Sequence, residues 1–365
     1  MPKSITFVLM GSGRTPVGGL KIVYEYANSL VAREWHVNII HPAILKLPKE
    51  SLIDSIKFLI VYCRRLVSKW YLPLSWFQID KRVRMMWVPT LNEKFIPNAN
   101  YIVACPVESA SFVNSYSAKK GEKFYFLQHF EDWAMKKEDV EKTWKFPMKK
   151  IVISQWLKNL AVQLGEEAIY IPNGLDFSFF KNMVPFTQRP LQSVIFLSHT
   201  LEIKGTRYVI EAIKILRKKH PGMIIRSFSV YPKPEDFPEF IEYFVSPSQI
   251  MLRDLYNSSA IFISPSLSEG WPLPPAEAMM CGCVVIATDI GGHREYIDDG
   301  VNGFLCKPAS VESIVEKVEY TLHNSDKAQK ISEYAPQTLN KFDWDSRVDL
   351  FEKALLSFPA TKLIK

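Results

Sequence analysis

The residues best suited to chemistry are two glutamates separated by seven residues, Glu269 and Glu277. The first follows a short apolar run that ends in Ser264-Pro265-Ser266, and the second comes after a proline-rich stretch. Prolines and carboxylates suit the first turn of a helix, so Glu269 is expected in a loop and Glu277 about two helical turns later. At that separation the two carboxylates can hold different hydroxyl groups of one extended ligand.

The stretch between the two glutamates offers backbone groups as well. Gly270, Trp271 and Leu273 stand at the expected helix entrance, with Pro272 in the same segment. Backbone N–H groups at such an entrance can receive a phosphate or sugar oxygen. A sugar nucleotide would satisfy the hydroxyl and phosphate contacts together. The competing interpretation is that the carboxylates only stabilise a helix start and that the prolines punctuate a loop.

These residues belong to a predicted strand–loop–helix–strand unit over residues 261–308, in which Gly291-Gly292 opens another loop-to-helix junction. Such units place polar residues at the carboxyl ends of strands, where open α/β sheets bind ligands. Strands and helices alternate in both halves of the chain, and periodicity disappears over residues 177–190. The sequence therefore predicts an α/β protein with two doubly wound Rossmann-like domains facing a cleft, over residues 1–176 and 190–345.

Two further candidate positions lie in the first half of the chain. Gly18 and Gly19 follow a strand expected over residues 5–10, where they can let the backbone approach a diphosphate or simply form a tight strand-to-helix turn. His129 follows a strand expected over residues 123–127 and is flanked by Gln, Glu and Asp. It is therefore either a polar site residue or a structural histidine.

Another candidate lies at the start of the second half. Lys204 and Gly205 precede a helix predicted over residues 206–219. At a helix entrance a lysine can meet a phosphate as a flexible point charge, although most such lysines are only solvated.

Composition narrows the classes of function. The 365 residues carry 45 Lys and Arg against 38 Asp and Glu, a net charge of +7 that is mixed through the chain. This moderate excess fits a polyanionic donor or an anionic membrane surface better than nucleic acid. The five cysteines form no C-x-x-C motif, and we interpret them as packing residues of a protein in a reducing cytosol. No metal-binding cluster is predicted, and no apolar run approaches the ~20 residues of a spanning helix.

Residues 51–77 combine apolar positions at helical spacing with lysines, arginines and four closely following aromatic residues. A basic, aromatic amphipathic segment can lie in a membrane interface, which would suit a lipid-linked acceptor. The alternative is an ordinary helix of the first domain that packs on its sheet.

The string EGWPLPPAEAMMCGCVVIATDIGGHREYIDDGVNG, residues 269–303, resembles the E-x7-E signature of retaining glycosyltransferases of family 4. The Gly18-Gly19 pair, the segment YFLQHFEDW around His129, and PNGLD at residues 172–176 are similar to that family as well. The resemblance covers most of residues 4–350. It implies the GT-B fold, with an acceptor-side first domain, a sugar-nucleotide-binding second domain, and a last helix, over residues 346–365, that crosses back onto the first domain.

The resemblance also implies roles. Glu277 would bind ribose hydroxyls, Glu269 sugar hydroxyls, and Lys204 with Gly205 and nearby amides the donor diphosphate. His129 would face the reacting sugar. The donor-binding segment would further include Gly18, Gly19 and residues 270–273.

One position departs from the family pattern R-x4-K-G, because His199 stands where the arginine is expected. A neutral imidazole cannot supply the permanent bidentate charge of a guanidinium. Either Lys204 meets the diphosphate alone, or another cation such as Arg14 assists.

The expected activity is metal-independent transfer of a hexosyl or deoxyhexosyl group from a nucleoside-diphosphate sugar to a glycan or lipid-linked acceptor, without a cofactor. Cell-surface polysaccharide or glycoconjugate synthesis is the expected setting. The expected location is the cytoplasm, with peripheral contact to the inner face of the membrane through residues 51–77. Two other hypotheses stay open: a sugar-nucleotide epimerase of the same fold, and a sugar-nucleotide-binding protein without activity.

Overall fold

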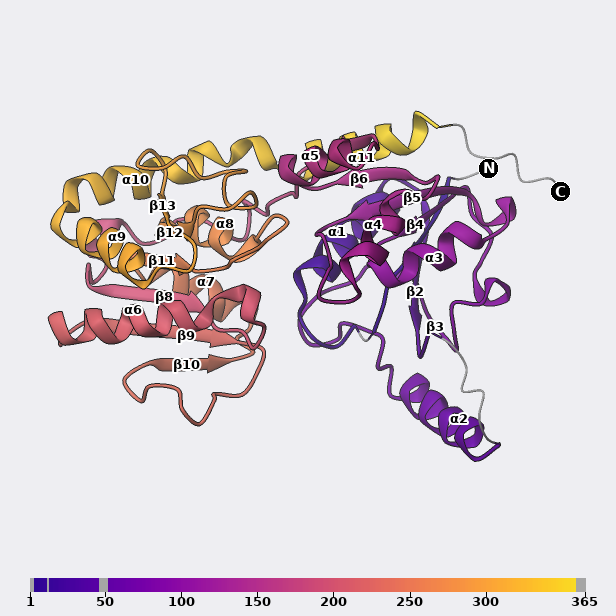
Figure 1. Ribbon diagram of the computed structural model, residues 1–365, viewed down its shortest axis with the longest axis horizontal. Coiled ribbons are helices and arrows are strands. Elements are labelled where there is room, and N and C mark those ends of the chain that lie inside the picture. Colours follow the sequence, from indigo (N-terminus) through magenta and orange to yellow (C-terminus); the bar gives the residue numbers. More distant parts are fainter. Residues whose placement is uncertain (1–2, 12, 46–51, 359–365) are drawn as a thin grey trace. The chain divides into compact units, whose positions relative to one another are not determined.

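The computed structural model of the chain describes residues 3–11, 13–45 and 52–358 (Figure 1). Its internal contacts divide it into two compact units. Unit 1 comprises Met1–Pro172 and Asp345–Lys365, and unit 2 comprises Asn173–Trp344. Ser51 of the basic segment and the last seven positions of the helix expected over residues 346–365 lie outside the described residues.

Unit 1 is built on a parallel sheet whose described strands follow the order β3-β2-β1-β4-β5-β6-β7. The order reverses between β1 and β4, so right-handed crossovers place helices on both faces of the sheet. The strands are β1 (Ser4–Val8), β2 (His36–Pro42), β3 (Arg84–Val88), β4 (Tyr101–Ala104), β5 (Glu122–Leu127), β6 (Lys149–Val152) and β7 (Ala168–Tyr170). The helices are α1 (Gly18–Ala32), α2 (Leu52–Val67), α3 (Val107–Ser115), α4 (Lys137–Trp144), α5 (Gln155–Gln163) and α11 (Trp344–Leu356).

The last described helix, α11, belongs to unit 1 almost entirely. The Phe351 ring stacks on Tyr26 of α1, with 4.3 Å between the ring centroids. The Arg33 guanidinium meets the Asp349 carboxylate at 2.6 Å, and the Trp35 indole donates to Glu352 at 3.0 Å. An apolar face and a charged edge therefore both attach this helix to the unit in which the chain begins.

Unit 2 repeats the same architecture. Its described strands form a parallel sheet in the order β10-β9-β8-β11-β12-β13, which reverses between β8 and β11. The strands are β8 (Ser193–Leu197), β9 (Ile224–Ser229), β10 (Glu242–Val245), β11 (Ile261–Ser264), β12 (Val284–Thr288) and β13 (Phe304–Cys306). The helices are α6 (Thr206–Lys219), α7 (Gln249–Asn257), α8 (Leu273–Met280), α9 (Val311–His323) and α10 (Ser325–Thr338).

The strands at the centre of each sheet are nearly continuous apolar runs because helices cover both faces. Every residue of β11 and of β12 is buried, and each strand is apolar up to its last residue, Ser264 or Thr288. Two parallel sheets, each with one reversal of strand order, confirm the predicted pair of doubly wound Rossmann-like domains. No helix in the described part of the chain has the length and apolar character needed to cross a bilayer.

One predicted element is wrong. The Gly291-Gly292 junction opens turns and not a further α-helix. In this stretch, helix-like bonds run from the amides of His293 and Arg294 to the Ile290 carbonyl and from the amides of Tyr296 and Ile297 to the His293 carbonyl. Beyond them, the Asn302 side chain accepts from the Asp298 amide and donates to the Tyr296 carbonyl, and these two bonds hold the chain in a tight loop before β13.

Candidate functional site

The predicted donor-binding residues of unit 2 lie at the point where the strand order reverses. Lys204 follows β8, and Glu269 follows β11, the strand that pairs directly with β8. Both side chains therefore stand beyond the carboxyl ends of adjacent parallel strands. This is the position at which open α/β sheets bind ligands.

The structure brings Lys204 and Glu269 into a bidentate ion pair, although 65 residues separate them in the chain. The Lys204 ammonium lies 2.8 Å from one carboxylate oxygen of Glu269 and 2.9 Å from the other. The Ser266 hydroxyl donates to the same carboxylate at 2.8 Å. The side chain of Glu269 is 12% exposed and that of Lys204 is 24% exposed, so the pair is largely shielded but reachable from solvent.

The electrostatics of this pair keep Glu269 ionised. Burial on its own would raise the pKa of the carboxyl, but the Lys204 charge and the hydrogen bonds from Lys204 and Ser266 outweigh it, and the pKa lies below its ordinary value. At neutral pH the site therefore holds a carboxylate beside the lysine. An anionic ligand that approaches Lys204 meets a cation whose position is already set.

Two glycines allow the loops of the pair to approach closely. Gly205 has φ +67°, and a Cβ at this position would strike the carbonyl oxygen of Pro265 in the neighbouring loop. A Cβ on Gly292 would lie 2.9 Å from the Glu269 side chain. The glycine in the predicted Lys204-Gly205 entrance thus serves the packing of one loop on another, in a backbone conformation that favours glycine.

The segment between Glu269 and Glu277 is buried as it enters α8. Gly270, Trp271, Pro272 and Leu273 are all buried, and Glu277 on the helix is only 5% exposed. The Trp271 indole packs against other aromatic rings, with its centroid 4.7 Å from that of Tyr296 and 5.3 Å from that of Phe342. Contacts to a ligand from Trp271 are thus left to its backbone.

Hydrogen bonds from outside the segment hold its carbonyl groups. The Tyr296 hydroxyl donates to the Pro272 carbonyl at 2.8 Å, and the Asn173 amide donates to the Trp271 carbonyl at 3.4 Å. Asn173 belongs to the PNGLD segment noted in the sequence. The entrance of α8 is therefore set by residues from two distant parts of unit 2.

His199, which replaces the expected arginine, is neutral. Its Nδ1 accepts a hydrogen bond from the Leu201 amide at 2.9 Å, so the ring proton sits on Nε2. Burial and the neighbouring Lys204 lower its pKa, with Glu269 opposing them. His199 can donate one hydrogen bond but adds no charge to a diphosphate site.

Another histidine of unit 2, the fully buried His293, was not singled out from the sequence as a site residue. Its Nδ1 lies 2.7 Å from the Thr288 carbonyl, so Nδ1 donates, and its Nε2 accepts from the Ser264 hydroxyl at 2.8 Å. The Thr288 hydroxyl in turn donates to the Ser266 carbonyl. This network ties the end of β12 to the loop that carries Ser266 and Glu269. The histidine in the GGHRE string was the available signal.

His293 gives the fold a defined pH response. Burial lowers its pKa to about 4, below the ordinary value of 6.5 in an unfolded chain. Because the unfolded state then binds more protons, stability is full above pH 6.5 and falls as pH drops toward 4, by about 2 kcal/mol at pH 5 from this residue. A His293→Gln variant should show a smaller loss of unfolding free energy between pH 7.5 and pH 5 in urea titrations. His323→Gln, at an exposed histidine, is the control and should keep the wild-type slope. Equal slopes in all three proteins would contradict the assignment.

In unit 1 the structure brings Gly19 next to the segment that holds His129. Gly18 and Gly19 begin α1, and the Gln128 side chain donates to the Gly19 carbonyl at 3.2 Å. His129 follows β5 and lies edge-on to Trp133, with 4.5 Å between the ring centroids. Its Nδ1 lies 3.0 Å from the Phe130 carbonyl, which orients the ring. The two candidate positions of the first half thus share one edge of the sheet.

Glu131, two residues beyond His129, was also not singled out as a site residue. Its carboxylate accepts from the Val107 amide at the start of α3, at 2.6 Å. Burial raises its pKa to about 7, although the amide hydrogen bond opposes that rise. The carboxyl therefore ties the loop after β5 to α3 and titrates near neutrality.

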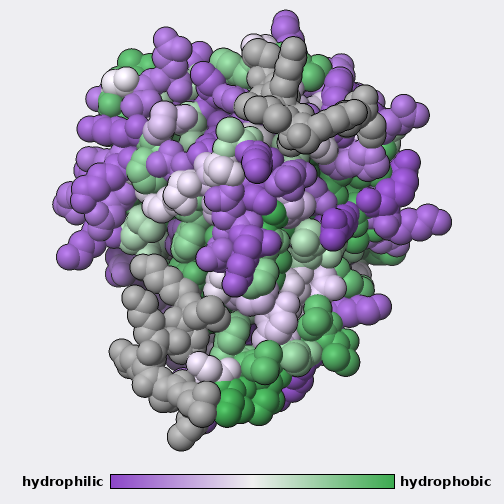
Figure 2. All heavy atoms as spheres, turned by 90° about the vertical axis from the view of Figure 1, so that its right-hand side faces the viewer, coloured by the Kyte–Doolittle hydropathy of each residue, from purple (hydrophilic) through white to green (hydrophobic). Residues whose placement is uncertain are grey.

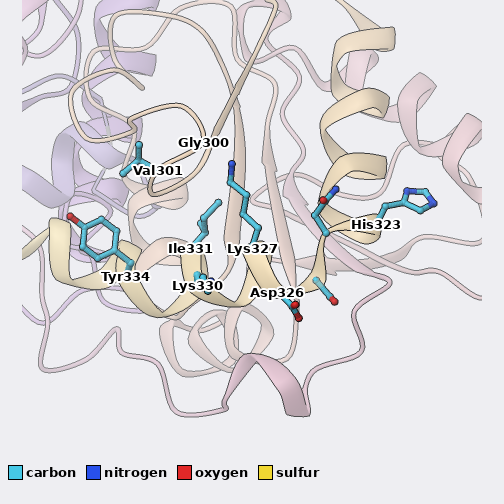
Figure 3. A pocket seen from close by; sticks show the side chains of 10 residues that line it. Gly300, Val301, His323, Asp326, Lys327, Lys330, Ile331 and Tyr334 are labelled. Atoms are coloured by element: carbon cyan, nitrogen blue, oxygen red, sulfur yellow. The ribbon is translucent and has the colours of Figure 1, made fainter.

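Other features of the described residues lie apart from these positions. A hollow of about 670 Å³ is lined by Gly300, Val301 and the first turns of α10, and Figure 3 shows Lys327 pointing from that helix toward the Gly300 loop. None of the predicted site residues line it. Within the described ranges, no group of three or more His, Cys, Asp or Glu side chains is arranged to hold a metal ion.

Part of the chain is similar to a family of known proteins. Residues 243–338 match the model of the family described as glycosyl transferases group 1. An uncharacterised glycosyltransferase of Methanocaldococcus jannaschii is 27% identical over 206 residues, which are 54% of this chain and 56% of the relative. A D-inositol 3-phosphate glycosyltransferase of Corynebacterium urealyticum is 24% identical over 180 residues, 45% of this chain and 42% of the relative. The chain thus spans about half the length of the curated relatives it matches.

Solved structures resemble the whole chain. Sucrose-phosphate synthase from Thermosynechococcus elongatus superposes with a TM-score of 0.73 at 14% identity, over 98% of this chain and 100% of that one. Anabaena HepE in complex with UDP-glucose gives a TM-score of 0.73 at 15% identity, over 97% and 100% of the two chains. The chain therefore has the GT-B fold, and its second unit carries a segment similar to the glycosyl transferases group 1.

Proposed function

We propose that this protein is a retaining glycosyltransferase that moves a hexosyl or deoxyhexosyl group from a nucleoside-diphosphate sugar to a glycan or lipid-linked acceptor. The observation that carries the proposal is the Lys204–Glu269 pair, because it places a shielded cation where the strand order of unit 2 reverses. Glu269 also lies inside the segment that matches the group 1 family. Polysaccharide or glycoconjugate synthesis in the cytoplasm is the setting we propose.

In this reaction the bond from the anomeric carbon to the diphosphate oxygen breaks, and a bond to the acceptor hydroxyl forms. The acceptor hydroxyl gives up its proton to the departing diphosphate oxygen, and the nucleoside diphosphate leaves with the bonding electrons. Lys204 meets the negative charge that grows on the leaving diphosphate, which is the interaction with the greatest effect on the rate. No metal ion is assigned a part in this scheme.

Glu269 has two tasks in the proposed site. It holds the Lys204 ammonium through both carboxylate oxygens, and these oxygens have further lone pairs that can accept hydrogen bonds from sugar hydroxyls. Glu277, buried on α8, would accept from the ribose hydroxyls. His129 of unit 1 is assigned to the acceptor side, facing the reacting sugar. His199 adds one neutral donor for the diphosphate.

The relatives suggest where to begin the search for the donor. HepE was solved with UDP-glucose and also with UDP and glucose, which makes uridine diphosphate sugars the first to test. A panel of uridine, guanosine and adenosine diphosphate sugars should be screened for a rise in unfolding temperature, since a ligand that binds the native state stabilises it. Donors that stabilise the protein then enter transfer assays with glycan and lipid-linked acceptors.

The panel separates the alternatives. A sugar-nucleotide epimerase would convert the donor with no acceptor present, and an inactive binding protein would be stabilised by a donor without turnover on any acceptor. Absence of both stabilisation and transfer across the panel would overturn the proposal. The expected result is stabilisation by one class of donor and product formation that depends on the acceptor.

The role of Glu277 predicts a loss of donor affinity. In Glu277→Gln the ribose hydroxyls lose a charged acceptor, and the dissociation constant of the nucleoside diphosphate should rise by roughly 10- to 100-fold, the value of one hydrogen bond to a charged group. Titration calorimetry with the free nucleoside diphosphate measures this change without catalysis. Glu235→Gln, at an exposed loop glutamate of the same unit, should bind like the wild type. If Glu277→Gln bound the nucleoside diphosphate as tightly as the wild type does, Glu277 would have no part in binding the ribose.

A further inference from the structure

Helix α2 exposes an apolar stripe. Its apolar residues recur at the spacing that places side chains on one face of a helix, at Ile56, Leu59, Ile60, Cys63 and Val67. Their exposure is high for apolar residues, at 51% for Ile56, 57% for Leu59, 61% for Ile60 and 82% for Val67. The cysteine between them is exposed as well. In Figure 1 this helix lies apart from the other helices of unit 1, and in Figure 2 hydrophobic side chains gather at the same lower end of the molecule.

The opposite side of α2 attaches it to unit 1. The Tyr62 hydroxyl donates to the Trp87 carbonyl at 3.0 Å, and its ring stacks on the Trp87 indole. Tyr71, just after the helix, stacks on the same indole with 6.0 Å between the centroids. The helix is thus held through aromatic contacts, and its apolar stripe points away from the sheet. In the predicted segment 51–77, the apolar stripe of α2 therefore does not cover the sheet, whereas Trp76 and Phe77 pack on Tyr24 of α1.

Cations border the stripe. Lys57 and Arg64 lie seven residues apart and therefore share one flank of the helix, where both are exposed. Arg65 and Lys69 add charge near the end of the helix, and Asp54 is the one acidic residue among positions 54–69. An exposed apolar stripe with cations along its edge matches an anionic lipid surface, whose acyl chains meet the stripe and whose headgroups meet the cations.

A second copy of the chain fits the stripe less well. In an antiparallel two-fold contact between α2 helices, the flank of Lys57 and Arg64 would face the same cations of the other copy. The area is also small. A helix of 16 residues is about 24 Å long, and a stripe about 10 Å wide covers roughly 240 Å², well below the roughly 800 Å² per partner of a stable interface.

We propose that α2 is a membrane-docking helix that lies in the surface of an anionic bilayer, with Ile56, Leu59, Ile60, Cys63 and Val67 among the acyl chains and Lys57 and Arg64 at the headgroups. The docking does not depend on the proposed transfer reaction. The docking proposal can therefore be confirmed or contradicted whatever the outcome of the transfer assays.

The full-length protein supplies its own probe for this docking. Cys63 is exposed and the other four cysteines are buried, so a thiol-reactive, environment-sensitive fluorophore should label Cys63 selectively. Vesicles of phosphatidylcholine with 30% phosphatidylglycerol should shift its emission to the blue, and pure phosphatidylcholine vesicles should not. Raising the salt concentration from 0.1 to 0.5 M should weaken the response, because the headgroup attraction is screened.

Unlabelled variants give an independent measurement by sedimentation with the same vesicles. Ile56→Gln/Ile60→Gln and Lys57→Gln/Arg64→Gln should each reduce the bound fraction by at least 10-fold. Val162→Gln is the matched control, because Val162 is an apolar residue 66% exposed on another helix of unit 1, and it should bind like the wild type. All substitutions are at exposed positions, and unchanged unfolding temperatures will show that the variants fold.

Three outcomes would overturn the proposal. The first is a wild-type protein that neither sediments with the anionic vesicles nor shifts the Cys63 probe. The second is equal binding to pure phosphatidylcholine. The third is a dimer in light scattering that the Ile56→Gln/Ile60→Gln change dissociates, which would assign the stripe to a second copy of the chain.

Discussion

Replacing Lys204 with alanine is expected to lower kcat for sugar transfer by ~10²- to 10³-fold, the usual loss when one preorganised donor to the developing charge is removed. The ammonium is held by both oxygens of Glu269 before any donor binds, so no reorganisation is needed when charge builds on the leaving diphosphate. Steady-state transfer assays with the stabilising donor measure the change. The Michaelis constant should rise less than kcat falls, because the contact strengthens as the diphosphate leaves.

The same substitution should also destabilise unit 2. It leaves the Glu269 carboxylate, 12% exposed, without its cation, which should cost roughly 3 kcal/mol of unfolding free energy, the low end for a broken buried pair. The double variant Lys204→Met/Glu269→Gln removes both charges and should recover most of that stability while transfer stays low. Urea denaturation of the single and double variants therefore separates the contribution to folding from the contribution to catalysis.

The Lys214–Glu211 pair on α6 provides the control for both measurements. Its charged atoms also lie 2.8 Å apart, but both side chains are about half exposed. Lys214→Ala should retain full transfer activity, because an exposed pair of this kind has little influence on stability or on a distant site. If Lys204→Ala and Lys214→Ala behaved alike in transfer, the assignment of Lys204 to the diphosphate would be wrong.

Much of the fold follows from local patterns. The buried strands β11 and β12 are apolar runs that each end in one polar residue. Helix α6 begins and ends at the residues that helical spacing predicts, Thr206 and Lys219. The sequence pattern indicates these elements because a strand buried on both faces requires a continuous run of apolar residues, and a helix buried on one face requires apolar residues at helical spacing. The two doubly wound sheets could be predicted for that reason.

The site was only partly accessible from the sequence because its key contacts join distant residues. Spacing and position at helix entrances singled out Glu269, Glu277 and Lys204 as candidates one by one. The Lys204–Glu269 pair, however, exists only because β8 and β11 are neighbours in the sheet. The network of His293 likewise depends on the register of β12. The neutral state of His199 follows from one backbone hydrogen bond that no local pattern predicts.

The amphipathic pattern of α2 illustrates another limit. Periodicity shows that residues 56, 59, 60, 63 and 67 share a face, but an apolar face can cover a sheet or be left exposed. Here the aromatic contacts with Trp87 occupy the other side of the helix and decide the orientation. Which face of α2 is covered depends on tertiary contacts, so helical spacing alone cannot predict it.

The close approach of the two site loops predicts a second large effect, at Gly205. An alanine there faces two penalties: a left-handed backbone at φ +67° and a Cβ placed on the Pro265 carbonyl. Together these should lower the unfolding free energy by roughly 2–5 kcal/mol. Relief of the clash must move the Lys204 loop away from the Glu269 loop, so transfer should fall by at least 10-fold even at temperatures where the variant is folded, since small displacements of a catalytic group are costly.

Gly300→Ala isolates the cause of that effect. Gly300 lies in the same unit with φ +72°, but a Cβ there meets only the flexible end of Lys327, at 3.6 Å. This variant carries the backbone penalty alone, so it should lose only about 1–2 kcal/mol and keep wild-type transfer. Thermal denaturation and transfer assays on the two variants should therefore differ both in the size of the destabilisation and in the loss of activity. If Gly205→Ala and Gly300→Ala lost the same stability and the same transfer activity, the contact between the loops after β8 and β11 would have no part in positioning Lys204. The Lys204–Glu269 pair would then form independently of that contact.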